Sequence, residues 1–444
     1  MLEQTQELFS LSVAQRGMWF AQKFSPRNSI FNIAEMVEIH GPIDATVFTD
    51  ALHQTATEAE AVRLCFVEQT DGLQQFVRST VQGILPLMDF SADANPLAAA
   101  ERWMHDEFMA PHDPLHDRLW TCGLIRLANT HFIWYHRSHH ILLDGFGGGL
   151  FARRLADVYS ALLENRAPGE TPFGSLSELL AEDQLYRDSE RFERDRDYWV
   201  TRFADRPEPV TLATRQAPSQ GGLLRRTCQL PAAAVARIRD VARQADSSLP
   251  QLMISATAVY FYRMTGVQDL VLGLPVTGRL SKRLRQIPGL VANVVPLRVT
   301  MRSGMSVREL MQSVGRQVRE SLRHQRYRYE DLRRDLHLLA EQKHLLTTVI
   351  NIEPFDYDLR FGGHPVTVHN LCNGSVEDLA IFVYDRGDGK GLRIDFDASP
   401  ALYTGAELER HQARFLRLLE AFVADPDQPI GQLRILEAAE RQHL

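Results

Sequence analysis

One stretch in the first half of the chain decides the fold, and it reads Trp134-Tyr135-His136-Arg137-Ser138-His139-His140-Ile141-Leu142-Leu143-Asp144-Gly145-Phe146-Gly147-Gly148-Gly149. Its aromatic-rich first half favours a β-strand over a helix. The glycines that follow Asp144 favour a turn to which another molecule can come close. A strand that ends in two histidines before such a turn is where we first expect chemistry.

The alternation of side chains along a strand separates the two histidines. His136, Ser138 and His140 are expected on one face of the strand, so His139 points to the other face. Only one histidine of the pair can then face a given cavity. We expect one to pack and hydrogen bond inside the protein and the other to meet solvent or substrate.

A metal site is the first alternative, because His136, His139, His140 and Asp144 are all ligand types. On an extended strand His136 and His140 lie roughly 13 Å apart, at about 3.3 Å per residue, too far to share one ion. No HExxH arrangement is present. We therefore expect no metal ion at this site. General acid–base catalysis by a histidine fits the residues better. The plainer alternative is that His140 is a buried, hydrogen-bonded histidine and Asp144 caps a helix that begins near Gly149.

Composition limits the classes of function. The chain has 444 residues, which predicts two domains or lobes. Its net charge of -7 gives no basic field for nucleic acid. The four cysteines form no CxxC pair, and no apolar run is long enough to span a membrane. We expect a cytoplasmic protein with reduced thiols that binds neither nucleic acid nor membrane.

The chain alternates between strand and helix patterns, which predicts an α/β protein. We place the boundary between an N-terminal lobe (1–175) and a C-terminal lobe (176–444) near the charged 175–203 segment. Expected strands cover 31–40, 62–67, 119–127, 131–139, 223–230, 270–275, 294–299, 346–352, 380–385 and 392–396. Expected helices cover 9–24, 44–60, 97–108, 150–163, a pair within 175–203, 232–245, 248–265, 306–324 and 405–423.

The central motif resembles a known family signature. His139-His140-x-x-x-Asp144-Gly145 is similar to the HHxxxDG motif of condensation domains of nonribosomal peptide synthetases, relatives of chloramphenicol acetyltransferase. Further segments resemble family motifs in the same order: Ser12–Trp19, the Arg63 segment, Tyr198-Trp199, Gly273–Arg279, Asn293–Pro296 and His324–Tyr327. The resemblance thus covers nearly the whole chain.

The resemblance implies a fold and a reaction. The fold is two acyltransferase-like lobes in a V-shaped pseudo-dimer with a central tunnel. The reaction is amide formation between a donor acyl thioester and the amine of an aminoacyl thioester. No cofactor is bound covalently; the phosphopantetheine arm of a carrier protein and acyl-CoA are substrates. The implied partners are an aminoacyl carrier protein, an acyl-CoA or acyl carrier as donor, and neighbouring synthetase domains such as an adenylation domain.

The resemblance also assigns catalytic roles. His140 is the catalytic histidine, acting either as general base or as a positioning group; the sequence leaves both open. Gly145 offers a backbone N–H near the developing oxyanion. Asn351 resembles a polar position that helps hold the intermediate, with a turn-forming asparagine at a strand end as the alternative.

Other residues are expected to support this site. His139 and Asp144 are structural. Asp144 is expected to pair with Arg279, and Arg63 is a second candidate, because an arginine among apolar neighbours needs a partner. A surface ion bridge of little energetic value is the alternative for that pair.

Phe146, Gly147 and Gly148 are candidates for the donor channel. The family often has a tryptophan or phenylalanine and then a serine after Asp-Gly, whereas here Phe146 is followed by three glycines, which would widen the tunnel toward long or bulky acyl chains. The alternative is that they only make the turn into the next helix.

The start of the chain bears on the donor. Met1 lies close before Ser12, so we expect no preceding carrier domain, and the donor would arrive in trans. This favours a starter domain that attaches a fatty acyl group, as in lipoinitiation. Elongation with an aminoacyl or aryl donor, a noncatalytic carrier-recruiting platform and an epimerisation domain are the alternatives; an intact His140 argues against the platform.

Overall fold

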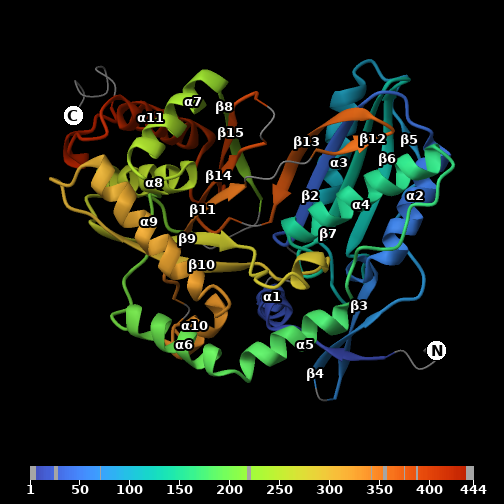
Figure 1. Cartoon of the computed structure of the whole chain (residues 1–444), viewed down its shortest axis with the longest axis horizontal. Helices are drawn as coiled ribbons and strands as arrows, with labels where there is room; N and C mark the ends of the chain where they lie inside the picture. Colours follow the sequence, from blue (N-terminus) through green and yellow to red (C-terminus); the bar gives the residue numbers. More distant parts are fainter. Residues whose placement is uncertain are drawn as a thin grey trace. The chain divides into compact units, whose positions relative to one another are not determined.

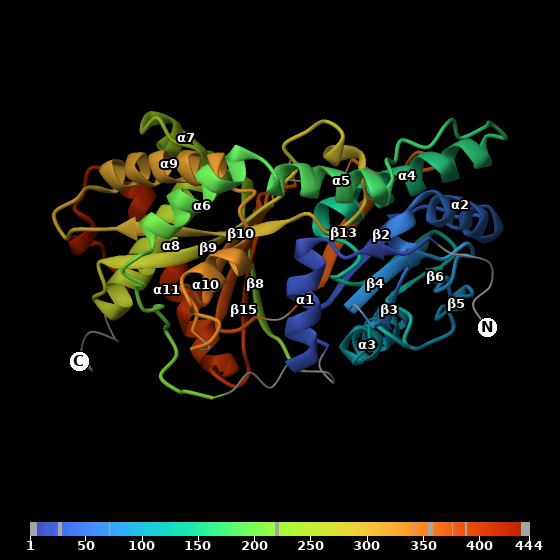
Figure 2. The same cartoon turned by 90° about the horizontal axis from the view of Figure 1, so that it is seen from below.

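The computed structural model describes residues 7–24, 29–70, 72–217, 222–341, 343–353, 358–374, 376–386 and 389–436. The chain start at Met1 lies outside these ranges. The chain divides into two compact units (Figures 1 and 2). Unit 1 consists of Met1–Ser189, Thr277–Ala292 and Tyr357–Ser375, and unit 2 of Glu190–Val276, Asn293–Asp356 and Val376–Leu444.

Unit 1 contains a six-stranded sheet of order β12-β13-β2-β7-β6-β5 and a three-stranded sheet of order β1-β4-β3. The strands are β1 (Phe9–Ser10), β2 (Asn32–His40), β3 (Leu64–Gln69), β4 (Gly72–Val77), β5 (Met88–Asp89), β6 (Trp120–Ala128), β7 (His131–His139), β12 (Arg360–Phe361) and β13 (His364–Asn373). The helices are α1 (Val13–Phe24), α2 (Ala45–Glu58), α3 (Pro96–Met109), α4 (Gly145–Leu163) and α5 (Leu176–Arg187), with short 3-10 turns η1 (Glu60–Arg63) and η2 (Leu284–Gln286).

The larger sheet of unit 1 is covered on both faces (Figure 1). Val37 and Trp134, on one face, pack with the apolar side of α2 and α4. Met36 and Tyr135, on the other face, pack with α3. The strict alternation of β2 and β7 thus gives each face its own core. Figure 2 shows α1 beside β3 and β4, and Gln15 of α1 donates a 2.8 Å hydrogen bond to Gln75 of β4.

Unit 2 is built on one six-stranded sheet of order β10-β9-β11-β14-β15-β8. Its strands are β8 (Leu224–Leu230), β9 (Asp269–Val276), β10 (Asn293–Thr300), β11 (Thr348–Glu353), β14 (Leu379–Tyr384) and β15 (Leu392–Ala398). Its helices are α6 (Glu190–Arg202), α7 (Ala232–Gln244), α8 (Leu249–Thr265), α9 (Val307–Arg323), α10 (Tyr329–Asp335) and α11 (Gly405–Ala424), with the 3-10 turn η3 (Ile430–Gln432). One sheet face, including Ile381 and Phe396, packs with α8, α9 and α11 in a single core.

The two units are not the two continuous segments expected from a single boundary at 175/176. The α5 helix remains in unit 1, and two later segments, 277–292 and 357–375, also belong to it. The second segment joins unit 1 because β13 pairs antiparallel with β2, from Val366 opposite Ile39 to Asn373 opposite Ile33. This pairing links residues more than 300 positions apart, so no local pattern could reveal it.

Two local predictions need correction. The glycines after Asp144 do not form a turn before the helix, because α4 begins at Gly145 and Asp144 is its N-cap. Arg63 was expected inside a strand, whereas it ends the 3-10 turn η1, and β3 begins only at Leu64. The other expected helices and strands are present within a few residues of their expected bounds.

Candidate active site

His140 directly follows β7 and is held by two hydrogen bonds. Its backbone N–H donates to the carbonyl of Phe31 at 2.7 Å. Its ring Nδ1 lies 2.8 Å from the carbonyl oxygen of Leu143. A carbonyl can only accept, so Nδ1 carries the proton and Nε2 is left with a free lone pair. The ring is partly exposed, and it is therefore oriented to accept a proton at Nε2.

His139 is bound in a different way. It is 1% exposed, its Nδ1 accepts the N–H of Ile141 at 3.1 Å, and its Nε2 faces Gln22 Oε1 at 3.4 Å. Burial, followed by the neighbouring charges of His140, His112 and Arg137, lowers the pKa of His139 to about 3. His139 is thus a neutral, buried support for the turn that carries His140.

Asp144 accepts hydrogen bonds from three backbone N–H groups and one arginine. Oδ1 accepts the N–H of Gly147 at 2.8 Å, which caps α4. Oδ2 accepts the N–H groups of Val291 at 2.9 Å and Ala292 at 2.8 Å. Burial alone raises the pKa of Asp144, but the charge and hydrogen bond of Arg279 and the backbone donors lower it overall. Asp144 is therefore ionised and fixed.

Arg279 is the charge partner of Asp144. Its Nη1 lies 2.6 Å from Asp144 Oδ2, and its Nη2 donates to the carbonyl of Gly289 at 3.0 Å. The side chain of Arg279 is 0% exposed and that of Asp144 2%. The guanidinium carbon also lies 4.8 Å from the centre of the Phe146 ring. The pair is buried, so the alternative of a surface bridge does not describe it.

The start of α4 presents two different glycine environments. A Cβ at Gly147 would lie 3.0 Å from the N and 3.1 Å from the O of Gly289, so here two backbones touch. Outside its own helix and among the described residues, a Cβ at Gly148 would come within 4.0 Å of Cε1 of His136 alone, although Gly148 itself is buried. Gly147 therefore serves packing, whereas Gly148 borders open space.

Gly145 is the first residue of α4 and is exposed. The N–H groups of the first helical turn have no acceptor within the helix, and the helix dipole places positive potential there. This N–H can therefore bind a negatively charged oxygen.

Two other candidates make contacts that do not include residues of the motif. Arg63 donates to the carbonyl oxygens of Arg78 at 2.5 Å and Thr57 at 2.8 Å, and burial lowers its pKa, opposed by Glu60. These contacts join η1 to α2 and to the residue that follows β4, and they involve no residue of the motif. Asn351 lies on β11 of unit 2, where its Nδ2 donates to Glu353 Oε1 at 2.8 Å.

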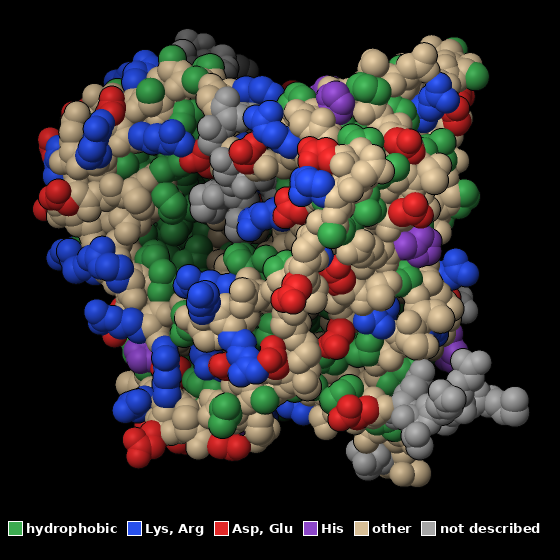
Figure 3. Space-filling view, turned by 45° about the vertical axis from the view of Figure 1, so that its right-hand side comes forward, with side chains coloured by type: hydrophobic (Ala, Val, Ile, Leu, Met, Phe, Trp, Pro, Cys, Tyr) green, Lys and Arg blue, Asp and Glu red, His purple; other side chains and the backbone are tan. Residues whose placement is uncertain are grey.

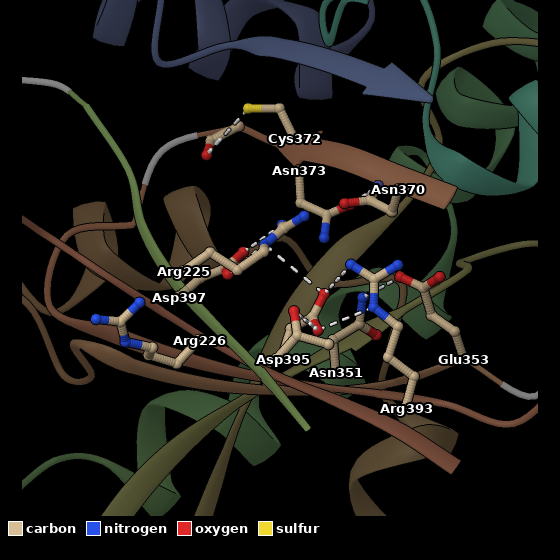
Figure 4. A network of polar contacts seen from close by, with 12 residues as sticks. Arg225, Arg226, Asn351, Glu353, Asn370, Cys372, Asn373, Arg393, Asp395 and Asp397 are labelled. Carbon is tan, nitrogen blue, oxygen red and sulfur yellow. Dashed lines mark hydrogen bonds and ion pairs between the residues drawn. The ribbon is translucent and has the colours of Figure 1, made fainter. Parts of the chain in front are cut away.

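Asn351 shares its sheet face with an ionic network (Figure 4). Strand register places Asn351 opposite Phe382, and Phe382 opposite Asp395. Arg225 binds Asp397 at 2.6 Å, and Arg393 binds Asp395 at 2.7 Å. The strand that carries Asn351 is thus part of a cross-strand polar layer.

Metal and membrane features can be checked over the part of the chain that the structure describes. Within it, no group of three or more His, Cys, Asp or Glu residues is placed to hold a metal ion. Nor does any helix in those residues have the length and apolar character needed to cross a bilayer. Figure 3 shows basic and acidic side chains mixed over the visible face.

Several supporting residues escaped the sequence analysis. Gln22 and the amides of Val291 and Ala292 contact the motif from distant positions. Gln22 could have been noticed, because a glutamine on an amphipathic helix facing the core is unusual. Backbone amides carry no sequence signal at all.

Known proteins are similar to this chain over nearly its whole length. A family profile described as the condensation domain matches residues 5–444. The chain is 42% identical over 434 residues to a dimodular nonribosomal peptide synthase of Bacillus subtilis (strain 168). It is 43% identical over 430 residues to an isonitrile lipopeptide synthase of Streptomyces coeruleorubidus. These matches cover 98% and 96% of this chain but only 18% and 29% of the relatives.

Solved structures resemble the chain over nearly its whole length. A variant of the starter condensation domain of rhizomide synthetase RzmA, in complex with C8-CoA, has a TM-score of 0.91 at 42% identity, covering 97% of this chain and 98% of that one. The first condensation domain of the calcium-dependent antibiotic synthetase, in complex with a substrate analogue, has a TM-score of 0.89 at 30% identity, covering 96% and 100%.

Proposed function

Because the chain belongs to the condensation-domain family of nonribosomal peptide synthetases, which form amide bonds, we propose that it acts as a starter domain. In this function it transfers an acyl group from acyl-CoA to the amine of an aminoacyl thioester on a carrier protein. The acceptor would come from a carrier protein loaded by an adenylation domain of the same synthetase.

The proposed catalytic role rests on one hydrogen bond of His140, which holds the proton of its ring on Nδ1. Nδ1 donates to Leu143, so Nε2 is directed by the turn and is free to accept a proton or hydrogen bond from the attacking amine. When the amine attacks the thioester carbon, the carbonyl oxygen gains negative charge, which the N–H of Gly145 would stabilise. The thiolate then leaves as the tetrahedral intermediate collapses to the amide.

Neighbouring residues would hold this arrangement in place. His139 and Asp144 fix the turn from both sides of His140, and Arg279 neutralises Asp144. Asn351 is proposed to contact the intermediate through its side-chain amide, with Glu353 orienting that amide. Arg63 stabilises the fold of unit 1 in this proposal and has no part in the chemistry.

The acyl-CoA donor is supported by similarity. The RzmA starter domain, 42% identical to this chain, was solved with C8-CoA, and one of its structures also contains Leu-SNAC. The relative at 43% identity is a lipopeptide synthase. The open space at Gly148 is suited to a donor chain, while Phe146 and Gly147 would form its fixed border.

The test is an amide-formation assay with an aminoacyl carrier protein and two donor panels, acyl-CoAs and acyl carrier proteins of matched chain length. We expect turnover with acyl-CoA and a loss of about 10²–10⁴-fold in kcat for His140→Ala. Undiminished product from His140→Ala would contradict the role of His140. Turnover with acyl carriers but never with acyl-CoA would replace the starter function by elongation, and no amide with any donor would favour a carrier-recruiting platform.

A further inference from the structure

Two buried glutamines form a hydrogen-bonded pair beside the turn that carries His140. Gln15 of α1 is 2% exposed and Gln75 of β4 is 0% exposed. Their side-chain amides bond to each other twice, with Nε2 of Gln15 2.8 Å from Oε1 of Gln75 and Nε2 of Gln75 2.9 Å from Oε1 of Gln15. Both amides are thus removed from water, where a donor or acceptor left without a partner would cost about 1–3 kcal/mol.

The backbone around the pair fixes which way the two amides point. Oε1 of Gln15 accepts the backbone N–H of Ser12 at 2.9 Å, so this end of the amide must be the oxygen. Nε2 of Gln15 is therefore directed to the carbonyl oxygen of Ile141, 3.4 Å away. Nε2 of Gln75 donates its other hydrogen to the carbonyl of Ser10 at 3.0 Å. Both N–H bonds of each amide consequently have an acceptor, and one of these acceptors belongs to the turn.

The Ile141 carbonyl lies in the middle of the turn between His139 and Leu143. The N–H of Leu142 donates to the carbonyl of His139 at 3.0 Å, and Nδ1 of His140 lies 2.8 Å from the carbonyl oxygen of Leu143. Rotation of the Ile141 peptide group would move the Leu143 carbonyl, two residues later, relative to the His140 ring. The donor that fixes this peptide group therefore bears on which nitrogen of His140 carries the proton.

A second contact to the turn comes from the same face of α1. Gln22 lies two helical turns after Gln15, and its Oε1 is 3.4 Å from Nε2 of His139. Trp19, between the two glutamines, is 6% exposed and packs in the core of unit 1. Residues spaced by three or four share one face of a helix. This face of α1 thus contacts the turn at two points about 10 Å apart along the helix axis.

We propose that Gln15 is a positioning residue for the condensation reaction, which holds the Ile141 peptide group so that Leu143 keeps the proton of His140 on Nδ1. This rests on the proposed function of the domain. Packing alone does not require the amides, because two apolar side chains of the same shape can replace a hydrogen-bonded pair with little loss of stability. Gln75 fixes Gln15 and, among the described residues, makes no hydrogen bond to the turn itself.

Three variants separate stability from positioning. Gln15→Met and Gln75→Met each keep the volume but leave the partner amide unpaired, so both should unfold at a lower urea concentration. The double variant Gln15→Met/Gln75→Met replaces both partners by apolar groups of similar shape and should recover part of that stability. Gln75→Met is the matched control, because it disrupts the same pair but leaves the donor to Ile141 in place.

The first readout is the tautomer of His140, measured by nitrogen NMR on chains with isotope-labelled histidine. The His140 signals are identified by their absence in His140→Ala. We expect the wild type and Gln75→Met to show a protonated Nδ1 and an unprotonated Nε2 at neutral pH. In Gln15→Met and in the double variant, the two signals should move toward each other as both tautomers become populated. Unchanged His140 signals in both variants would overturn the proposal.

The second readout is amide formation from acyl-CoA and an aminoacyl carrier protein, in buffer where each variant is folded. Gln15→Met and the double variant should lose about 10- to 100-fold in kcat with a nearly unchanged KM for acyl-CoA, since a displacement of about 1 Å can have an effect of this size. Gln75→Met should show a smaller fall.

The double variant decides between positioning and a merely structural role. If it recovers kcat together with stability, or if the His140 signals shift while kcat stays at the wild-type value, Gln15 does not position the reaction. If the wild-type chain forms no amide with any donor, yet the His140 signals respond to Gln15→Met and not to Gln75→Met, the proposed function fails while the effect of Gln15 on His140 stands.

Discussion

Asp144 Oδ2 lies 2.6 Å from Nη1 of Arg279, a residue 135 positions later, and both side chains are buried in unit 1. The same carboxylate caps α4 and binds the amides of Val291 and Ala292. One side chain thus attaches segment 277–292 to the start of the helix that follows His140. The stability of unit 1 and, in the proposed mechanism, the position of His140 therefore depend on the same pair.

Arg279→Ala is expected to leave Asp144 buried without its cation. Breaking a buried pair by removing one partner costs about 3–5 kcal/mol. We expect a lower midpoint of urea unfolding and a fall in kcat. Arg283→Ala is the control from the same segment, because Arg283 binds Glu178 with its side chain 59% exposed, and such pairs contribute at most about 1 kcal/mol. Equal destabilisation by both changes would contradict the role of Arg279.

The lowered pKa of His139 predicts how the free energy of unfolding depends on pH. Its folded pKa of about 3 lies below the unfolded value of about 6.5. Between these values the unfolded chain binds a proton that the folded chain does not, so the free energy of unfolding falls as the pH falls from 6.5 toward 3. At pH 5 the loss from this residue is about 2 kcal/mol.

The measurement is urea unfolding of the wild-type chain and His139→Gln at pH 7.5, 6 and 5. Glutamine does not titrate, so the variant should lose less stability between pH 7.5 and pH 5 than the wild type. Parallel pH profiles for the two proteins would show that His139 is not held neutral by burial.

Gly147 and Gly148 are neighbours with opposite expected responses to alanine. Gly147→Ala places a Cβ 3.0 Å from the backbone of Gly289, and such overpacking costs about 1–3 kcal/mol. Gly148→Ala finds open space and replaces a poor helix former by the best one, worth up to about 1 kcal/mol of added stability. Unfolding midpoints of the two variants measured side by side test this; a shift in the same direction would contradict it.

The sequence sufficed for much of the fold because local signals were strong. Asp44 caps α2 through its side chain, and the alternation of side chains along a strand is enough to separate His139 from His140. The sequence missed β13, because its partner β2 is distant in the chain and pairing leaves no local pattern. The glycines after Asp144 predicted a turn, because glycine generally favours turns. In the structure they lie in α4, where Gly147 packs closely against the backbone of Gly289.

Among the site residues, too, some contacts could be predicted from the sequence and others could not. The Arg279 partner of Asp144 could be expected from the family resemblance, whereas Arg63 turned out to bind backbone carbonyls instead. A buried arginine needs acceptors, but sequence does not say whether these are carboxylates or peptide oxygens. The difference between Gly147 and Gly148 leaves no sequence signal either, since it depends on which way each Cα–Cβ bond would point in the folded chain.

The surroundings of Gly148 also predict a way to change which acyl chain lengths the domain prefers. A side chain at this position enters the space beside His136, so Gly148→Arg should fill it and place a charge near an acyl chain. Because each buried methylene contributes about 0.8 kcal/mol, excluding three or four methylenes would lower kcat/KM for long donors by about 50-fold or more. The shortest donors should be used nearly as well as by the wild type.

The measurement is kcat/KM across a series of acyl-CoAs from two carbons upward for the wild type, Gly148→Ala and Gly148→Arg. The alanine variant is the control, because one methyl group leaves most of the space open. An unchanged length profile in Gly148→Arg, together with normal folding, would show that the donor chain does not pass Gly148. A uniform loss at every length would instead indicate that the arginine disturbs the start of α4 and its N–H groups.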